Sequence, residues 1–170
     1  MEILFISKGS LGKDEESSFN NFLAQENKLH DLSIDQLVLL YDAISKYWTS
    51  KECKVKDLLL KEGMGFILPW LKRKNITKLL KQNFVNYKIL DAPLLDKEDN
   101  QFYYARPCGL AVHWIAGNVP VLGVISLFQT LLAKNKSIVK VPASYKNVLP
   151  TILKDLEDSL FFKGESYNAL

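Results

Sequence analysis

The feature that most constrains the fold is a pair of apolar runs, each followed by a helical pattern, between residue 108 and the end of the chain. The run CGLAVHWIA (108–116) precedes a helix of about fifteen residues, the short apolar run SIVKV, and a helix from about Tyr145 to Leu160. Strand, helix, strand and helix in this order are typical of a parallel βαβ unit. We therefore predict an α/β fold in which residues 101–170 form the start of a parallel sheet.

The hydropathy of this unit predicts that it is deeply buried. The nearly continuous apolar run from Leu110 to Ala116 is typical of a strand that is covered on both faces. The following helix is apolar on almost every side, so a two-layer fragment could not bury it completely. We expect an incomplete sheet that needs further βα units, and hence the N-terminal part of a larger protein.

The sequence pattern of residues 1–100 predicts a helical region that ends in an extended connection. EILFI (2–6) is strand-like, and SSFNNFLAQ (17–25) indicates a short helix. Ser33 and Gln36 have the spacing of a capping box, and the apolar residues that follow recur at helical spacing as far as Trp48.

Two further helices are expected before the connection. One covers residues 52–61 and ends at a glycine-containing stretch, and the other covers residues 66–84. The latter carries a cluster of cations that either binds phosphate groups or forms a solvated surface: Lys72, Arg73, Lys74, Lys78 and Lys81. The segment 86–107 contains two prolines and several acidic residues, and we interpret it as an extended connection.

Composition limits the class of function. The chain has 170 residues, 48% of them hydrophobic and 24% charged, as expected for one globular domain. A net charge of +3 gives no case for nucleic acid or an anionic membrane as the main partner. The apolar stretch 119–132 is too short to span a bilayer. The N-terminus does not have the pattern of a signal peptide, so we expect a cytoplasmic location.

The two cysteines indicate neither a metal site nor a structural disulfide. Cys53 and Cys108 match no metal-ligand spacing, and we expect both thiols to be reduced. The pattern of a glycine loop that binds phosphate is also missing from the sequence. No metal is therefore expected.

Two polar residues stand out in the βαβ unit because of where they fall. Asn118 follows the end of the first strand and precedes Pro120, which is well placed in the first turn of a helix. Open α/β sheets bind ligands at the carboxyl ends of their strands, and an amide there can donate a hydrogen bond to an oxygen that becomes negative. The alternative is that Asn118 caps the helix.

Lys140 lies near the end of the second strand, 22 residues after Asn118. Adjacent parallel strands place both residues at the same edge of the sheet. There the ammonium can reach a hydroxyl or phosphate of a bound nucleotide, or it can extend to solvent from the strand end.

The stretch CGLAVHWIAGNVPVLGVISLFQTLLAKNKSIVKVPAS (108–144) resembles the acyl-CoA reductases of the LuxC type, the fatty-acid reductases of bacterial luminescence. KRKNITKLLKQNFVNYKILD (72–91) looks like the same family. The resemblance is strong from about Phe66 to Ser144. More distantly, the segment resembles the aldehyde dehydrogenase superfamily, whose members share the Asn–x–Pro turn, the buried helix and the strand that carries a lysine.

The resemblance implies a Rossmann-like cofactor domain, NADPH as hydride donor, and reduction of an acyl-CoA or acyl-carrier thioester to an aldehyde. By position, Asn118 matches the amide that stabilises the oxyanion. Ile115, Ala116 and Gly117 match the strand end along the nicotinamide side of the cofactor.

Lys140 matches the lysine that contacts the adenosine ribose. Many relatives that prefer NAD carry an acidic residue three positions later, where this chain has Ala143, followed by Ser144. A missing carboxylate removes repulsion toward a 2′-phosphate, which favours NADPH. We include Ser144 among the expected cofactor contacts.

The implied chemistry also needs a cysteine thiolate that takes up the acyl group. In this superfamily that cysteine lies far downstream of the Asn–x–Pro turn, and the chain ends at Leu170. We expect Cys108 to precede the strand at the end opposite Asn118 and to pack in the interior. Cys53 is expected inside a helix. His113 is either a general base or a histidine held under a packed helix, and we favour the second.

The sequence leaves three hypotheses for the function. The first is the N-terminal portion of an NADPH-dependent acyl thioester reductase that lacks its catalytic cysteine and is inactive alone. The second is a non-catalytic module of α/β type that binds a nucleotide or another subunit. The third is a structural α/β domain that resembles the family only in its packing. An incomplete domain exposes apolar surface, which predicts assembly with another copy or with the missing C-terminal part.

Overall fold

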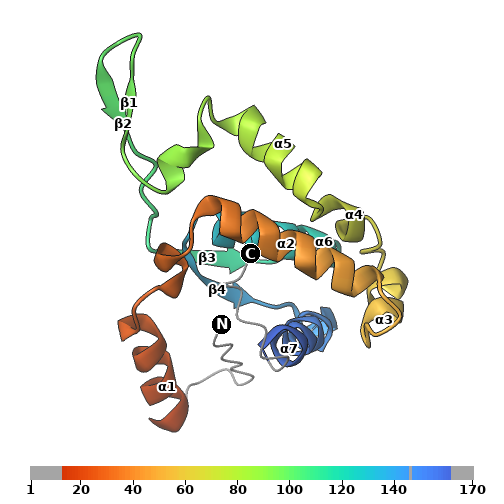
Figure 1. Ribbon diagram of the computed structural model, residues 1–170. Coiled ribbons are helices and arrows are strands. Elements are labelled where there is room, and N and C mark those ends of the chain that lie inside the picture. The colour runs from red at the N-terminus through yellow and green to blue at the C-terminus, as the bar shows by residue number, and fades with distance from the viewer. Residues whose placement is uncertain (1–12, 146, 162–170) are drawn as a thin grey trace.

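The computed structural model describes residues 13–145 and 147–161, which form a mixed α/β structure (Figure 1). The strand predicted at residues 2–6 lies outside the described residues. The helices and strands, in chain order, are α1 (Lys13–Ala24), α2 (Ile34–Thr49), α3 (Lys56–Lys61), α4 (Ile67–Trp70), α5 (Arg73–Asn83), β1 (Leu94–Asp96), β2 (Gln101–Tyr103), β3 (Leu110–Trp114), α6 (Pro120–Leu132), β4 (Lys136–Lys140) and α7 (Val148–Phe161). Short 3-10 helices precede α2 (Lys28–Asp31), β1 (Tyr87–Leu90) and α7 (Ala143–Tyr145).

The predicted βαβ unit is present. β3 and β4 pair in parallel, with Leu110 opposite Lys136 and Trp114 opposite Lys140, and α6 makes the connection between them. α7 then follows β4, as the sequence pattern indicates. The described residues contain two parallel strands of this sheet, which shows the α/β class.

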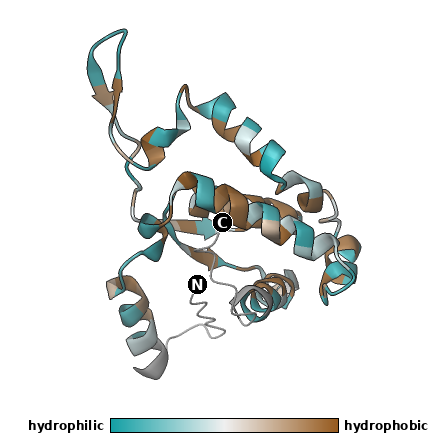
Figure 2. Cartoon of the chain, viewed as in Figure 1, coloured by the Kyte–Doolittle hydropathy of each residue, from teal (hydrophilic) through white to brown (hydrophobic). Residues whose placement is uncertain are grey.

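One face of the β3–β4 sheet is covered by helices. Phe128 of α6 contacts two aromatic residues of α2 edge to face, with ring centroids 5.1 Å from Tyr41 and 6.0 Å from Trp48. The Tyr41 hydroxyl also donates a hydrogen bond to the Phe128 carbonyl. Figure 2 shows the hydrophobic colouring of α6 behind α2, which agrees with a helix that is apolar on most sides. The prediction that α6 is largely buried is confirmed, although Leu122 is 58% exposed.

The other face of the same sheet is open among the described residues, which corrects the expectation that β3 is covered on both sides. Side chains alternate along a strand, and the outward-facing Leu110, Val112 and Trp114 are 38%, 67% and 80% exposed. The inward-facing His113 is 8% exposed. The apolar run indicated two covering layers, but among the described elements the outer face is approached at Lys136, whose Nζ donates to the carbonyls of Phe22 and Leu23 at the end of α1.

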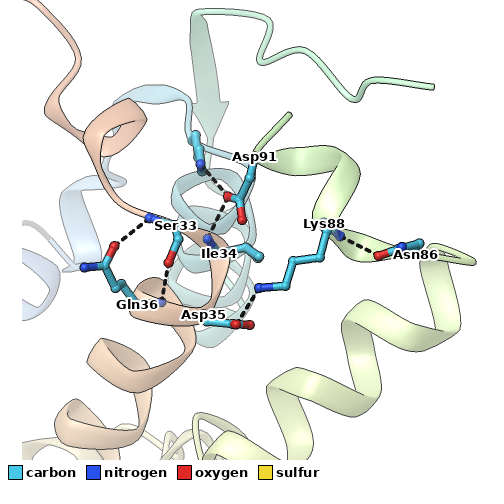
Figure 3. Close-up of polar contacts among 8 residues, drawn as sticks. Ser33, Ile34, Asp35, Gln36, Asn86, Lys88 and Asp91 are labelled. Atoms are coloured by element: carbon cyan, nitrogen blue, oxygen red, sulfur yellow. Dashed lines mark hydrogen bonds and ion pairs between the residues drawn. The ribbon is translucent and has the colours of Figure 1, made fainter. Parts of the chain in front are cut away.

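The start of α2 is fixed by the predicted capping box and by residues far away in sequence. The Ser33 hydroxyl accepts the N–H of Gln36, and the Gln36 side chain accepts the N–H of Ser33 (Figure 3). Asp91 accepts the N–H of Ile34 at 2.7 Å and forms an ion pair with the nearly buried Lys134 at 2.8 Å. These bonds tie α2, the segment before β1 and the end of α6 together.

Two predicted segments differ from the structure. The helix predicted over residues 66–84 is two helices. The backbone of Lys72 is not helical (ψ 140°), and the Asp42 carboxylate accepts the N–H of Arg73, where α5 begins. The connection predicted at residues 86–107 contains the antiparallel hairpin β1–β2, which projects away from the other elements (Figure 1). Asn100 has a φ of 56° in its turn, a backbone conformation that asparagine tolerates better than most residues.

The other helices occupy the predicted regions with different limits. α1 begins before the predicted residue 17, and α3 begins after the predicted residue 52. Among the helices within the described ranges, none combines the length and the hydropathy that a membrane span requires.

Candidate functional site

The candidate site is the edge of the sheet where β3 and β4 end. The parallel register places Trp114 opposite Lys140, and the N–H of Ile115 donates to the carbonyl of Lys140 at 3.3 Å. The backbone then turns at Gly117 and Asn118 before Pro120 begins α6. Asn118 and Lys140 therefore lie at the same edge of the sheet, as the spacing predicted.

The end of β3 is held in place by close packing against α6. Ile115 is 8% exposed and lies under Gly123 of the helix. A methyl group on Gly123 would stand 2.3 Å from Cδ1 of Ile115, much closer than a normal carbon–carbon contact. The absence of a side chain at Gly123 thus allows the helix to approach the strand end. This approach fixes the position from which residues 116–118 emerge.

The described structure does not support the capping interpretation of Asn118. Val119 occupies the N-cap position of α6 and makes no side-chain capping bond, so Asn118 lies one residue before the cap. Ala116, Gly117 and Asn118 are all exposed. The Asn118 amide is accessible at the start of a helix, where its hydrogen-bonding groups can meet a ligand.

Lys140 is exposed and lies on the outer face of the sheet. Its Nζ is 4.7 Å from the centroid of the Trp114 ring, a distance at which a cation is attracted to the face of an aromatic ring. Trp114 is therefore a member of the candidate site that the sequence analysis missed. Its position two residues before Ala116 was visible in the sequence, but its pairing with Lys140 required the register.

A small apolar hollow lies directly behind this edge. Val124 contributes to it from α6 and Ile115 from just after β3. The other lining residues come from the loop before α4, from the segment between β4 and α7, and from the start of α7: Met64, Val141, Pro142, Tyr145, Val148 and Leu149. The hollow shows that the region between the edge and α7 is apolar. The side chain of Ser144, which we expected to contact a cofactor, lies outside the described residues.

His113 is held beneath α6, as we favoured from the alternation of the strand. Its Nδ1 lies 2.9 Å from Oγ of Ser126 on α6, and its Nε2 lies 3.3 Å from Oγ of Ser137 on β4. Burial lowers the pKa of the imidazole, which favours the neutral ring. His113 faces α6 and joins it to both strands.

Neither cysteine lies at the candidate site. Cys108 comes just before β3, at the end opposite Asn118 as predicted, but it is exposed and the expectation that it packs in the interior is wrong. Cys53 is buried and precedes α3, so the prediction that it lies within a helix is also wrong. Burial raises the pKa of the Cys53 thiol, which disfavours the nucleophilic thiolate. Over the described ranges, no cluster of potential metal ligands is found.

Comparison with known proteins identifies the family. A family model described as acyl-CoA reductase (LuxC) matches residues 29–159. The long-chain acyl-protein thioester reductase of Aliivibrio fischeri is 26% identical over 142 residues, which cover 76% of this chain and 29% of that protein. The proteins of the same name from Vibrio harveyi and Photobacterium phosphoreum are each 26% identical and cover 75% and 68% of this chain.

The same alignments cover 30% of the Vibrio harveyi protein and 26% of the Photobacterium phosphoreum protein. The chain therefore spans less than a third of the length of these curated relatives. The matched region includes α2–α6, both strands of the parallel pair and nearly all of α7. The chain belongs to the LuxC acyl-CoA reductase family.

Proposed function

We propose that this chain supplies the cofactor-binding edge of an NADPH-dependent reductase that converts a fatty acyl thioester into an aldehyde. The observation that carries the proposal is the placement of Asn118 and Lys140 at one edge of a parallel βαβ unit. Family membership supports the reaction class, because the relatives are named as acyl-protein thioester reductases. The Rossmann-like arrangement and the division at residue 100 are parts of the same proposal.

The residues at this edge suit a dinucleotide that carries negative charge. Lys140 presents an exposed ammonium above the exposed Trp114 ring, and the residue three positions after the lysine is Ala143, which adds no negative charge. A cation without that carboxylate suits a ribose that carries a 2′-phosphate. Gly117 leaves room for close approach of a ligand to the backbone, because it has no side chain.

The proposed role of Asn118 follows from its position at the strand end. NADPH supplies the hydride when it is bound. During reduction of the thioester, negative charge would develop on the carbonyl oxygen, and the side-chain amide N–H of Asn118 would donate a hydrogen bond to it. The products would be the aldehyde and a thiolate. Ile115 and Gly123 hold the backbone that carries Asn118 in place.

We propose further that the acyl-accepting cysteine lies outside this chain. Cys53 is buried, which raises the pKa of its thiol and disfavours a nucleophilic role, and Cys108 lies at the end of β3 opposite the candidate edge. The 170-residue chain is therefore expected to bind NADPH and to form no aldehyde from acyl-CoA. Aldehyde formation by this chain alone would overturn the assignment of the nucleophile.

The test is titration of the purified chain with NADPH and with NADH. We expect binding of NADPH in the micromolar range, about −8 kcal/mol, and weaker binding of NADH. Lys140→Ala should weaken NADPH binding about tenfold or more, equivalent to about 1.4 kcal/mol. Lys97→Ala removes an exposed lysine from the turn of the projecting β1–β2 hairpin and should have no effect. Equal binding by wild type and Lys140→Ala would refute the cofactor site.

The proposed catalytic role of Asn118 has to be tested in the longer reductase that contains this segment. Asn118→Ala should lower kcat for aldehyde formation by about 100-fold while NADPH binding is retained, because the amide acts on charge that develops during the reaction. Retained kcat would exclude the oxyanion role. Binding of NADPH without any reductase activity in the longer protein would instead support a non-catalytic nucleotide-binding module.

A further inference from the structure

The surface of α5 is strongly basic, and the sequence around it contains no acidic residue. Residues 63–90 include six cations and neither aspartate nor glutamate, whereas the other residues together include 16 basic and 19 acidic side chains. The net charge of the chain is therefore small although its basic and acidic residues are distributed unevenly along the sequence. In Figure 2, hydrophilic residues run along α5, which lies apart from the β3–β4 sheet. We call Arg73, Lys74, Lys78 and Lys81 the basic face.

Helix geometry gathers these cations on one side. Ile76 and Leu80 are buried and fix α5 against the other helices. Lys74, Lys78 and Lys81 are spaced four and three residues apart, so they are neighbours on the exposed surface. Like charges at this spacing repel one another, which makes the arrangement unfavourable for the isolated helix.

The basic face has no ion-pair partner among the described residues. The ion pairs of the structure involve other lysines. Asp42, which approaches the start of α5, accepts the backbone N–H of Arg73 and pairs with Lys46. These contacts occupy the Asp42 carboxylate and leave the ammonium groups of the basic face without a carboxylate in ion-pair contact.

The shape of the surface indicates an extended anionic partner. The basic face forms one open surface of α5 together with Thr77 and Gln82. The distance along the helix from Lys74 to Lys81 is about 10 Å, because an α-helix rises 1.5 Å per residue. Cations spread along a convex helix do not converge on one phosphate, and the lining has no aromatic side chain on which a nucleic-acid base could stack. A row of carboxylates on another protein matches this layout.

We propose that the basic face is a docking surface for an acidic protein that delivers the acyl thioester. The proposal rests on the proposed function and specifies the partner, since the relatives are named for acyl-protein thioesters. The charges guide encounter and hold the acyl-carrying protein, while reduction takes place elsewhere. The basic face is therefore a positioning surface.

Direct binding to the 170-residue chain tests the docking surface independently of any activity. The probe is fluorescein-labelled acyl carrier protein, an acidic protein, loaded with a dodecanoyl thioester and followed by fluorescence anisotropy. Reversal of Lys74, Lys78 and Lys81 to Glu should weaken binding at least about tenfold. Raising NaCl from about 50 to 500 mM should weaken wild-type binding similarly, because exposed charges are screened. The Lys→Gln triple variant removes these three charges and keeps Arg73, so its affinity should lie between those of wild type and of the Glu variant.

The matched control carries the same change in charge on another exposed surface. It reverses three exposed lysines outside α5, Lys51, Lys54 and Lys61. Undiminished binding by this control, together with loss in the α5 variants, supports the proposal. Equal binding by wild type and both sets of variants overturns it, as does tighter binding of a labelled single-stranded oligonucleotide than of the acidic protein.

Kinetics in the longer reductase separate failure of the surface from failure of the proposed function. The α5 triple reversal should raise KM for the acyl carrier protein substrate about tenfold and leave kcat unchanged. With the uncharged substrate S-dodecanoyl-N-acetylcysteamine, the variant should match wild type. Equal kinetics on both substrates would refute the docking surface alone, whereas no reduction of either substrate by wild type would refute the proposed function.

Discussion

Substitution of Gly123 by Ala tests whether close helix–strand packing sets the position of the candidate edge. The added Cβ would lie 2.3 Å from Cδ1, 2.8 Å from Cγ1 and 3.0 Å from Cγ2 of Ile115. Favourable carbon–carbon contacts lie at about 3.5–4.0 Å. All three atoms belong to one buried side chain, so either Ile115 changes its conformation or α6 moves away from β3.

Two opposing effects determine the size of the change. Extra volume in a packed interior destabilises by about 1–3 kcal/mol. Alanine is favoured over glycine inside a helix by about 0.8–1 kcal/mol, which offsets part of this loss. We therefore expect Gly123→Ala to lower the free energy of unfolding by about 1 kcal/mol, which urea denaturation can resolve.

The Ile115→Ala background should reverse the sign of the effect. Removal of Cγ1, Cγ2 and Cδ1 eliminates the three close contacts, so only the helix preference remains. Relative to Ile115→Ala alone, adding Gly123→Ala should then stabilise by about 0.8–1 kcal/mol. The coupling energy of the double-mutant cycle should be about 1–3 kcal/mol.

A stabilisation of similar size in both backgrounds would refute the reasoning, because it would mean that Gly123 and Ile115 are not in tight contact. Destabilisation in both backgrounds would show that the Cβ added at position 123 clashes with a residue other than Ile115. Circular dichroism of the four proteins checks that the helices are retained.

Three further predictions concern polar groups in the interior. Lys134→Met should lower the free energy of unfolding by about 1–3 kcal/mol in urea denaturation, because it leaves the partly buried Asp91 without its ammonium partner. Tyr41→Phe should cost about 0.5–1.5 kcal/mol in the same assay, because the buried hydroxyl donates to the Phe128 carbonyl. Burial lowers the folded-state pKa of His113, so the unfolded chain binds the proton first, and stability present at pH 7.5 should be lost as the pH falls through about 6.5. His113→Gln should reduce this pH dependence. An unchanged pH profile of stability in the variant would contradict the assignment of the effect to His113.

Local patterns in the sequence were sufficient for much of the fold. The Ser33–Gln36 capping box and the helical spacing that follows predicted α2, because these interactions form between residues close in sequence. The alternation of apolar runs and a helix predicted the parallel β3–α6–β4 unit, because this connection packs both strands into one sheet. The split between α4 and α5 was missed because it depends on Asp42, 31 residues before Arg73.

One part of the candidate site could likewise be predicted from the sequence, and another part could not. The sequence placed Asn118 and Lys140 at one edge, since their spacing and the parallel connection are enough to define it. The pairing of Lys140 with the Trp114 ring was decided by the strand register, which brings residues of different strands together.

The sequence by itself determined the α/β class, the βαβ unit, the resemblance to the LuxC family and the basic composition of α5. Only the tertiary structure decided which faces are covered. The apolar run of β3 indicated burial on both sides, yet Trp114 is exposed and His113 is enclosed. The physical reason is that hydropathy records the preference of a residue for burial, whereas actual burial depends on which elements pack against it.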